Sequence, residues 1–135
     1  MVALSLSLLF LNLNSHMVFM LVLKIERISQ FVAKDGSKIR EICKMECASL
    51  AEAVVGVGER TRKHRHMRSD EIYFILEGQG RVEVGEEREE VSAGEAIFIR
   101  KGEAHCIENI GTAPLRFLCI CSPPYSDEDT LLLEI

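Results

Sequence analysis

The chain has 135 residues, 47% of them hydrophobic and 27% charged, and its formal net charge is −5. This length suits one domain with a core of its own and is too short for two ordinary domains, and the hydrophobic content excludes a disordered chain. The acidic balance argues against nucleic acid as a partner. The five cysteines match no zinc-ribbon spacing, so we expect reduced thiols in a cytoplasmic protein.

Residues 1–23 carry no charge and are mostly apolar, which by length alone would allow a membrane-spanning helix. Residues 4–8 and 11–14 instead alternate apolar and polar side chains, as strands do. Polar residues in the middle of the stretch would also be costly inside a bilayer: Asn12, Asn14, Ser15 and His16. We therefore expect a strand-like extension packed on the domain or on a second subunit, with no membrane partner. Met17 and Met20 are alternative starts, so it is open whether residues 1–16 belong to the native protein.

The next segment carries weaker signals. Residues 24–32 fit a further strand, and the Asp35-Gly36 pair predicts a turn. Residues 49–55 fit a strand, although their alanines and glutamate also allow a helix.

Three of the four histidines lie between residues 58 and 109, at spacings that metal sites use. His64 and His66 are two residues apart, so on a strand they project to the same side. Glu71 and His105 each begin another strand-like run. Three imidazoles and one carboxylate from neighbouring strands suit one divalent transition metal per chain, and manganese, iron, cobalt, nickel and zinc all fit.

The same alternation places other side chains beside this candidate metal site. Tyr73 and Ile75 share the face of Glu71, and Ile107 shares the face of His105, so we expect these three to line a ligand pocket. A packed core position is an equally good interpretation of Tyr73. Arg62 would join the pocket if strand geometry extended back from the first histidine.

Arg62 also belongs to a run of five basic residues that would attract an anionic ligand: Arg60, Arg62, Lys63, Arg65 and Arg68. A solvated basic edge, balanced by the glutamates between residues 86 and 90, is the simpler alternative. No aromatic residues are interleaved with these charges, so a nucleic-acid groove is not expected.

After these motifs, glycine turns separate strand-like runs over residues 81–84, 88–91, 96–100 and 115–121, which indicates an all-β sandwich or barrel. Pro123 and Pro124 end the last run, because proline cannot continue a sheet ladder. Ser126 or Asp127 could then cap a helix with acidic residues in its first turn. We expect residues 126–135 to form a short helical tail.

In these motifs the chain resembles the cupin superfamily over about residues 45 to 122. The resemblance implies a double-stranded β-helix, or jelly-roll barrel, over residues 24–125, and it makes residues 49–55 a strand. It also implies that His64, His66, Glu71 and His105 bind the metal. Arg100 departs from the pattern, which usually has proline there. The matching positions form two blocks: Gly58, His64, His66, Glu71 and Gly78, and then Gly94, Gly102, His105 and Asn109.

The resemblance leaves the activity open, because one fold hosts many functions. We expect a metal-dependent enzyme that acts on a small oxygenated metabolite, anionic or sugar-like. Single-domain cupins of this kind are often similar to sugar-phosphate isomerases of the mannose-6-phosphate type, and others resemble dioxygenases or decarboxylases. A non-catalytic, metal-assisted binder or sensor is the alternative, and the catalytic residues are unknown. The apolar N-terminal residues and the habit of the family favour a homodimer.

Overall fold

The computed structural model describes residues 20–134, and residues 1–19 and 135 lie outside the described part. The strand-like extension expected over residues 1–23 therefore falls almost wholly outside it. Among the described residues, no helix has the length and apolar character needed to cross a bilayer.

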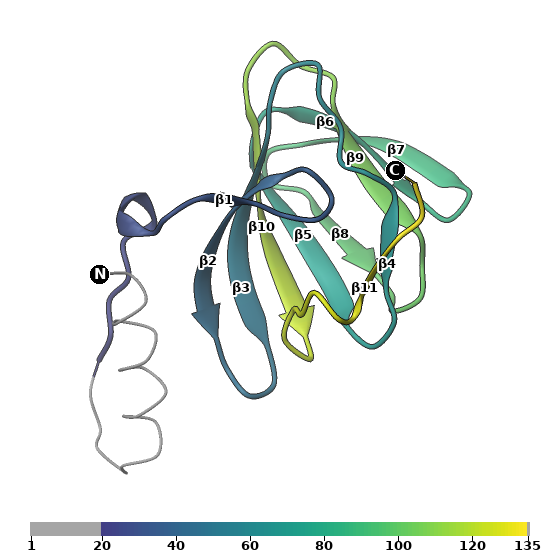
Figure 1. The fold of residues 1–135 in the computed structure, drawn as a ribbon. Helices are drawn as coiled ribbons and strands as arrows, with labels where there is room; N and C mark the ends of the chain where they lie inside the picture. Colours follow the sequence, from purple (N-terminus) through teal and green to yellow (C-terminus); the bar gives the residue numbers. More distant parts are fainter. Residues whose placement is uncertain (1–19, 135) are drawn as a thin grey trace.

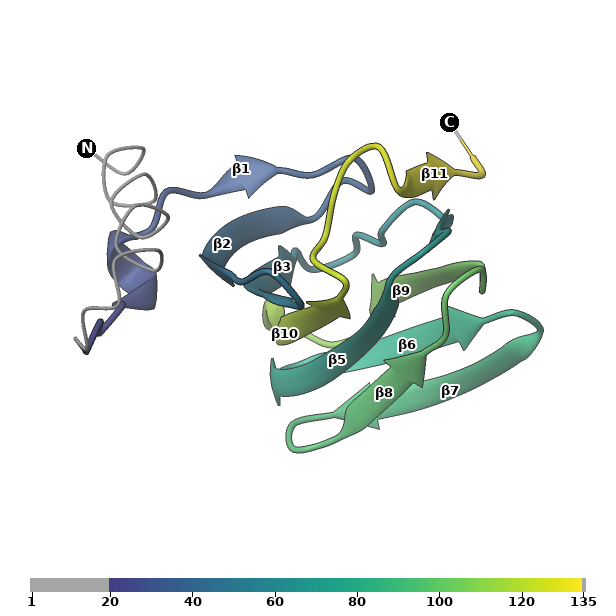
Figure 2. The ribbon, with the colours of Figure 1, turned by 90° about the horizontal axis from the view of Figure 1, so that it is seen from below.

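Two antiparallel sheets close on each other to form the barrel (Figures 1 and 2). A 3-10 helix, η1 (Ile25–Arg27), precedes them. The first sheet contains, in spatial order, β1 (Phe31–Val32), β2 (Lys38–Lys44), β3 (Ser49–Val55), β10 (Leu115–Ser122), β5 (Asp70–Glu77) and β8 (Ala96–Ile99). The second contains β11 (Thr130–Leu132), β4 (His64–His66), β9 (His105–Asn109), β6 (Gln79–Val84) and β7 (Glu87–Ser92). This is the all-β jelly roll that the sequence predicts.

Alternating burial along β5 shows how the sequence divides inside from outside. Glu71, Tyr73 and Ile75 are buried, whereas Ile72 and Phe74 between them face outward, as expected for a strand with one face on a core. The hydrophobic core lies between the sheets and includes Ala53, Val55, Ile75, Val82, Ile99, Ile107, Leu115 and Phe117.

The run over residues 49–55 is a strand, as the family resemblance implies. It is β3, and it pairs with β10 over its whole length and with β2 on its other side. Ala51 faces the barrel interior together with Ala53. These small side chains leave space inside the barrel, where larger residues would fill it.

The helix expected over residues 126–135 is wrong. The hydrogen bond expected of a helix N-cap is present, because Ser126 Oγ accepts from the Asp129 backbone N–H at 3.2 Å. The chain then becomes strand β11, which pairs with β4 through Thr130 opposite His66 and Leu132 opposite His64. Pairing with the otherwise open edge of β4 satisfies the backbone groups that a helix would have satisfied internally.

Gly78, in the turn between β5 and β6, packs closely against the backbone of Pro114 and Leu115. Its φ of +91° lies in the left-handed region, and an added Cβ would lie 2.7 Å from the Pro114 carbonyl oxygen. Gly94 has a similar φ of +88° but open space around it. We expect Gly94→Ala to lower the free energy of unfolding by about 1–2 kcal/mol, the cost of the backbone conformation. Gly78→Ala should cost about 1–3 kcal/mol more, because of the added overlap.

Urea denaturation of both variants, carried out with a chelator so that metal does not contribute, measures the difference. Equal losses for the two glycines would contradict the packing described at the β5–β6 turn.

Candidate metal centre

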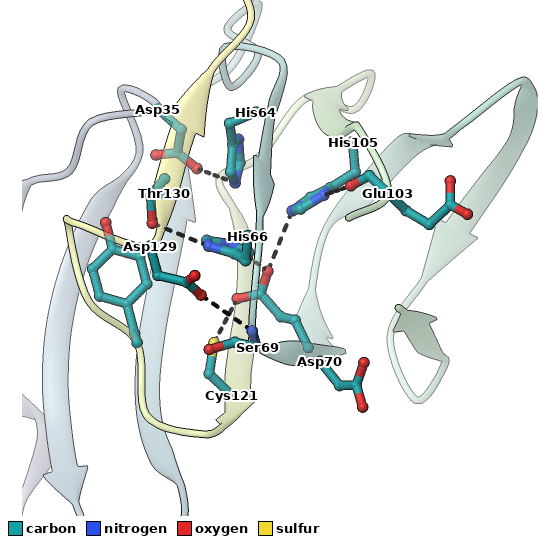
Figure 3. Close-up of polar contacts among 12 residues, drawn as sticks. Asp35, His64, His66, Ser69, Asp70, Glu103, His105, Cys121, Asp129 and Thr130 are labelled. Carbon is teal, nitrogen blue, oxygen red and sulfur yellow. Dashed lines mark hydrogen bonds and ion pairs between the residues drawn. The ribbon is translucent and has the colours of Figure 1, made fainter. Parts of the chain in front are cut away.

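The four predicted ligand residues come together inside the barrel. His64 and His66 come from β4 and His105 from β9, while Glu71 comes from β5 in the opposite sheet. One nitrogen or carboxylate oxygen from each residue lies within 4.8 Å of the others, and all four residues are buried. Figure 3 shows His64, His66 and His105 gathered in one place. The register places His64 directly opposite His105, so neighbouring strands deliver the two rings to one point.

Backbone and hydroxyl acceptors hold each imidazole. The Nδ1 of His64 lies 2.8 Å from the Arg62 carbonyl oxygen, and that of His105 lies 2.9 Å from the Glu103 carbonyl oxygen. Carbonyl oxygens only accept hydrogen bonds, so both Nδ1 atoms carry the proton and both Nε2 lone pairs are free. Such hydrogen bonds fix the tautomer and the ring orientation of metal-ligating histidines.

His66 is held in the same way by the chain's last strand. Its Nδ1 lies 3.0 Å from Thr130 Oγ1, and that hydroxyl donates to the Ser126 carbonyl oxygen at 2.9 Å. Thr130 therefore accepts from the ring, which leaves Nε2 of His66 unprotonated toward the centre.

The donor set fits a divalent cation. Oε1 of Glu71 lies 3.2 Å from His66 Nε2 and 3.3 Å from His105 Nε2. Among the described residues, Glu71 Oε1 and His105 Nε2 are nevertheless buried polar atoms without a hydrogen-bond partner. Buried polar atoms without partners are costly. A cation among them would accept all these lone pairs, and three nitrogens with one oxygen suit a first-row transition metal.

The surroundings of His64 and Glu71 affect their pKa values and therefore the protonation states available for metal binding. Burial, and next the neighbouring His105, lower the pKa of His64, so its ring is neutral near pH 7. Burial alone would raise the pKa of Glu71, whereas a proton on Nε2 of His105 or His66, or a cation in the same place, would hold that pKa below its ordinary value. Neutral imidazole and ionised carboxylate are the forms that bind metals.

Cys121 holds the second oxygen of Glu71. Its thiol lies on β10 and donates to Glu71 Oε2 at 3.1 Å. Burial, followed by the charge of Glu71, raises the pKa of Cys121, so the thiol keeps the proton that it donates. This contact directs Oε1 toward the three imidazoles. All five cysteines are free, as expected.

A cavity of about 320 Å³ adjoins the site, at the lower end of the range for small-molecule pockets. Its walls include three of the four predicted ligands: His64, His66 and Glu71. Ala51, Ala53, Phe117 and Cys119 form apolar parts of the wall. Tyr73 also lines the cavity, as the sequence predicts, and burial raises its pKa well above the ordinary value, so its hydroxyl stays protonated.

The other three residues expected in the pocket lie elsewhere. Ile75 and Ile107 face the interior but belong to the hydrophobic core, away from the cavity walls. Arg62 is exposed, because β4 begins only at His64 and the alternation does not extend back to it. Arg60 and Lys63 of the basic run form ion pairs with Glu134 and Glu83, whereas Arg65 is half-buried and its Nε has no hydrogen-bond partner within residues 20–134.

Sequence reasoning missed several residues around the site. Asp35, Tyr125 and Thr130 line the cavity, and Cys121 contacts Glu71. Asp35 was visible only as part of a turn, and Tyr125 and Thr130 lie in and beside the segment expected as a helix. Cys121 alone had a usable signal, because it occupies the inward face of a predicted strand together with Cys119.

Comparison with known proteins places this architecture in a family. The Cupin domain family matches residues 51–121. The chain is also 47% identical over 125 residues to a protein of Methanocaldococcus jannaschii, covering 87% of this chain and 100% of that one. The chain therefore belongs to the cupin family.

Two further similarities are more distant. Mannose-1-phosphate guanylyltransferase 2 of Escherichia coli O157:H7 is 26% identical over 118 residues, which are 84% of this chain but only 24% of that enzyme. The structure of Pac13, a nucleoside dehydratase, superimposes with a TM-score of 0.72 at 15% identity, over 87% of this chain and 93% of that one; it is a Streptomyces protein. At that identity the second likeness shows the fold alone.

The hydrogen bond from Cys121 predicts an effect on metal binding. Cys121→Ala removes the donor to Glu71 Oε2 and should weaken metal affinity about tenfold, the lower end of the range for partners of metal ligands. Cys121→Ser keeps a donor and should stay within about threefold of the wild type. Competition with a chromogenic chelator measures both affinities. Equal weakening in the two variants would show that the thiol only fills space.

Proposed function

We propose that the protein binds one divalent transition metal through His64, His66, Glu71 and His105, and that a small oxygenated metabolite coordinates this metal. The observation that carries the proposal is the pair of partnerless buried atoms, Glu71 Oε1 and His105 Nε2, beside a cavity large enough for a metabolite. Four protein ligands leave one or two coordination positions for such a molecule.

We propose catalysis as the role of this site, ahead of binding alone. A divalent ion at this position supplies Lewis acidity to a coordinated carbonyl or hydroxyl group. Tyr73, buried and protonated, is placed to donate a hydrogen bond to a ligand oxygen. Ala51 and Ala53, which line the same cavity, leave room for the ligand. Tyr73, Ala51 and Ala53 thus complement the metal ligands: Tyr73 would orient the substrate, and the two alanines would accommodate it.

Three versions of this function are open. A sugar-phosphate isomerase follows from the cupin resemblance, and the distant likeness to mannose-1-phosphate guanylyltransferase 2, of which the chain spans 24%, supports only a sugar phosphate as the ligand. A dioxygenase would require a redox-active ion such as iron. A non-catalytic, metal-assisted binder or sensor is the third version. The unpaired cysteines favour a cytoplasmic protein.

Metal content tests the proposal directly. Elemental analysis of the purified chain should find close to one transition metal per chain, and His105→Ala should lose it. His16→Ala is the matched control, because His16 is the one histidine outside the predicted ligand set, and it should retain the metal. A wild-type chain that neither contains metal nor takes it up from solution would refute the proposal.

Turnover separates the three versions. Metal-loaded chain is incubated with sugar phosphates, oxalate-like acids and catechols, and oxygen consumption is recorded. Isomerisation without oxygen uptake would support the first version, and oxygen uptake the second. A saturable thermal shift without turnover would support the sensor.

We also propose that the protein is a homodimer joined through the outer face of the first sheet. Ile72, Phe74 and Phe98 project from this face and are 39%, 38% and 57% exposed. Ile120 pairs with Ile72 and Leu118 with Phe74, so the apolar face continues onto β10. Contiguous apolar patches mark interaction sites, and a flat sheet face can pair with a second copy of itself about a two-fold axis.

Phe98→Asp tests this proposed dimer interface. Light scattering should give twice the chain mass for the wild type and a single chain mass for the variant, because the dimer would bury the introduced charge. Val57→Asp is the control: Val57 is equally exposed, at 56%, but lies in the turn after β3. A monomeric wild type, or a dimer that both variants preserve, would contradict the proposed interface.

A further inference from the structure

Asp35 faces the metal side of His64 from the opposite sheet. It lies in the turn between β1 and β2, and its side chain is only 14% exposed. Asp35 Oδ2 lies 3.9 Å from His64 Nε2, the nitrogen that points to the metal position (Figure 3). The carboxylate therefore lies beside the metal position without belonging to the set of four predicted ligands.

The turn holds this carboxylate in a fixed orientation. The Ser37 backbone N–H and hydroxyl both donate to Asp35 Oδ1, at 2.9 and 2.6 Å. The Arg62 backbone N–H donates to the Asp35 carbonyl oxygen at 2.7 Å, which ties the turn to the chain just before β4. With Oδ1 occupied in this way, Oδ2 is the oxygen turned toward the cavity.

The walls near Asp35 are rich in carboxylates and poor in cations. Lys44 is the one basic side chain among the described residues that line the cavity, against five acidic ones: Asp35, Glu41, Glu71, Asp127 and Glu128. Lys34, next to Asp35, directs its Nζ to the carbonyl oxygens of Asp127 and Thr130. A negatively charged group that approached the metal beside Asp35 would meet repulsion, whereas a hydroxyl could donate a hydrogen bond to Oδ2.

We propose that Asp35 sets the ligand class of this site. It selects ligands with a hydroxyl group adjacent to the oxygen that coordinates the metal, and it disfavours ligands with a carboxylate or phosphate in that place. This inference rests on the proposed metal site and narrows the proposed metabolite to hydroxylated carbonyl compounds or polyols. Asp35 thereby acts as a specificity-determining residue, which is distinct from a fifth metal ligand.

Two small probes differ only at the position in question. Hydroxyacetone carries a hydroxymethyl group beside its ketone, and pyruvate carries a carboxylate there. The full chain is loaded with Co²⁺, and each probe is titrated while the visible absorption of the cobalt is followed. Isothermal titration measures the Co²⁺ affinity separately.

Asp35→Asn keeps an oxygen for Ser37 and removes the charge. We expect the ratio of pyruvate affinity to hydroxyacetone affinity to rise at least tenfold, equivalent to about 1.4 kcal/mol, while the Co²⁺ affinity stays within about threefold. Glu86→Gln removes the same charge from the exposed turn between β6 and β7 and should change neither quantity. Matching circular dichroism spectra establish that both variants are folded.

The other outcomes overturn the inference in distinguishable ways. An unchanged affinity ratio with intact Co²⁺ binding refutes selection by Asp35 and leaves the proposed metal site standing. A large loss of Co²⁺ affinity in Asp35→Asn makes Asp35 a metal ligand and refutes the selective role. If hydroxyacetone does not bind to the loaded wild type, the ligand class is wrong. Failure of the wild type to bind Co²⁺ refutes the metal site itself, and the inference with it.

Discussion

The site depends on one constraint, the burial of the Glu71 carboxylate among three imidazoles that come from the other sheet. A carboxylate in a closed interior is costly unless positive charge or hydrogen-bond donors surround it. Here Cys121 donates to one oxygen, and the other lies 3.2–3.3 Å from two ring nitrogens whose protons are on the far side of the rings, so a cation between them would supply the missing compensation. The arrangement exists only when both sheets are folded and in register, so the chemistry of the centre and the closure of the barrel are linked.

The alternation of side chains along strands predicts much of the candidate site. The two-residue spacing of His64 and His66 correctly predicted a shared face, and the structure brings Glu71 and His105 to the same point. The alternation failed at Arg62, because the strand does not extend back that far. It also could not separate the cavity wall from the core behind it: Tyr73 lines the cavity, whereas Ile75, two residues on, belongs to the core alone. That boundary depends on which small side chains, such as Ala51, face it from another strand.

The remaining misses share a physical cause, which is competition from distant parts of the chain. Residues 126–129 carry a sound local signal for a helix start, but the open edge of β4 pairs with the residues that follow. Asp35 gave only a turn signal, and its place near His64 depends on how the β1–β2 turn is tied to residue 62. Neither contact leaves a trace in the spacing of nearby residues. The two-block pattern of the family places the four predicted ligands, while much of the cavity wall, including Asp35, Ala51 and Thr130, comes from segments outside those blocks.

Strand β11 affects the stability of the candidate metal centre. Thr130 accepts the hydrogen bond of His66 and belongs to β11, a short strand at the edge of the second sheet. Separation of β11 would release that ring and expose the β4 edge at the same moment, so the orientation of His66 and the pairing of β11 are thermodynamically coupled. A cation held by His66 would therefore stabilise the pairing of β11 as well, because it would bind the state in which that strand is in place.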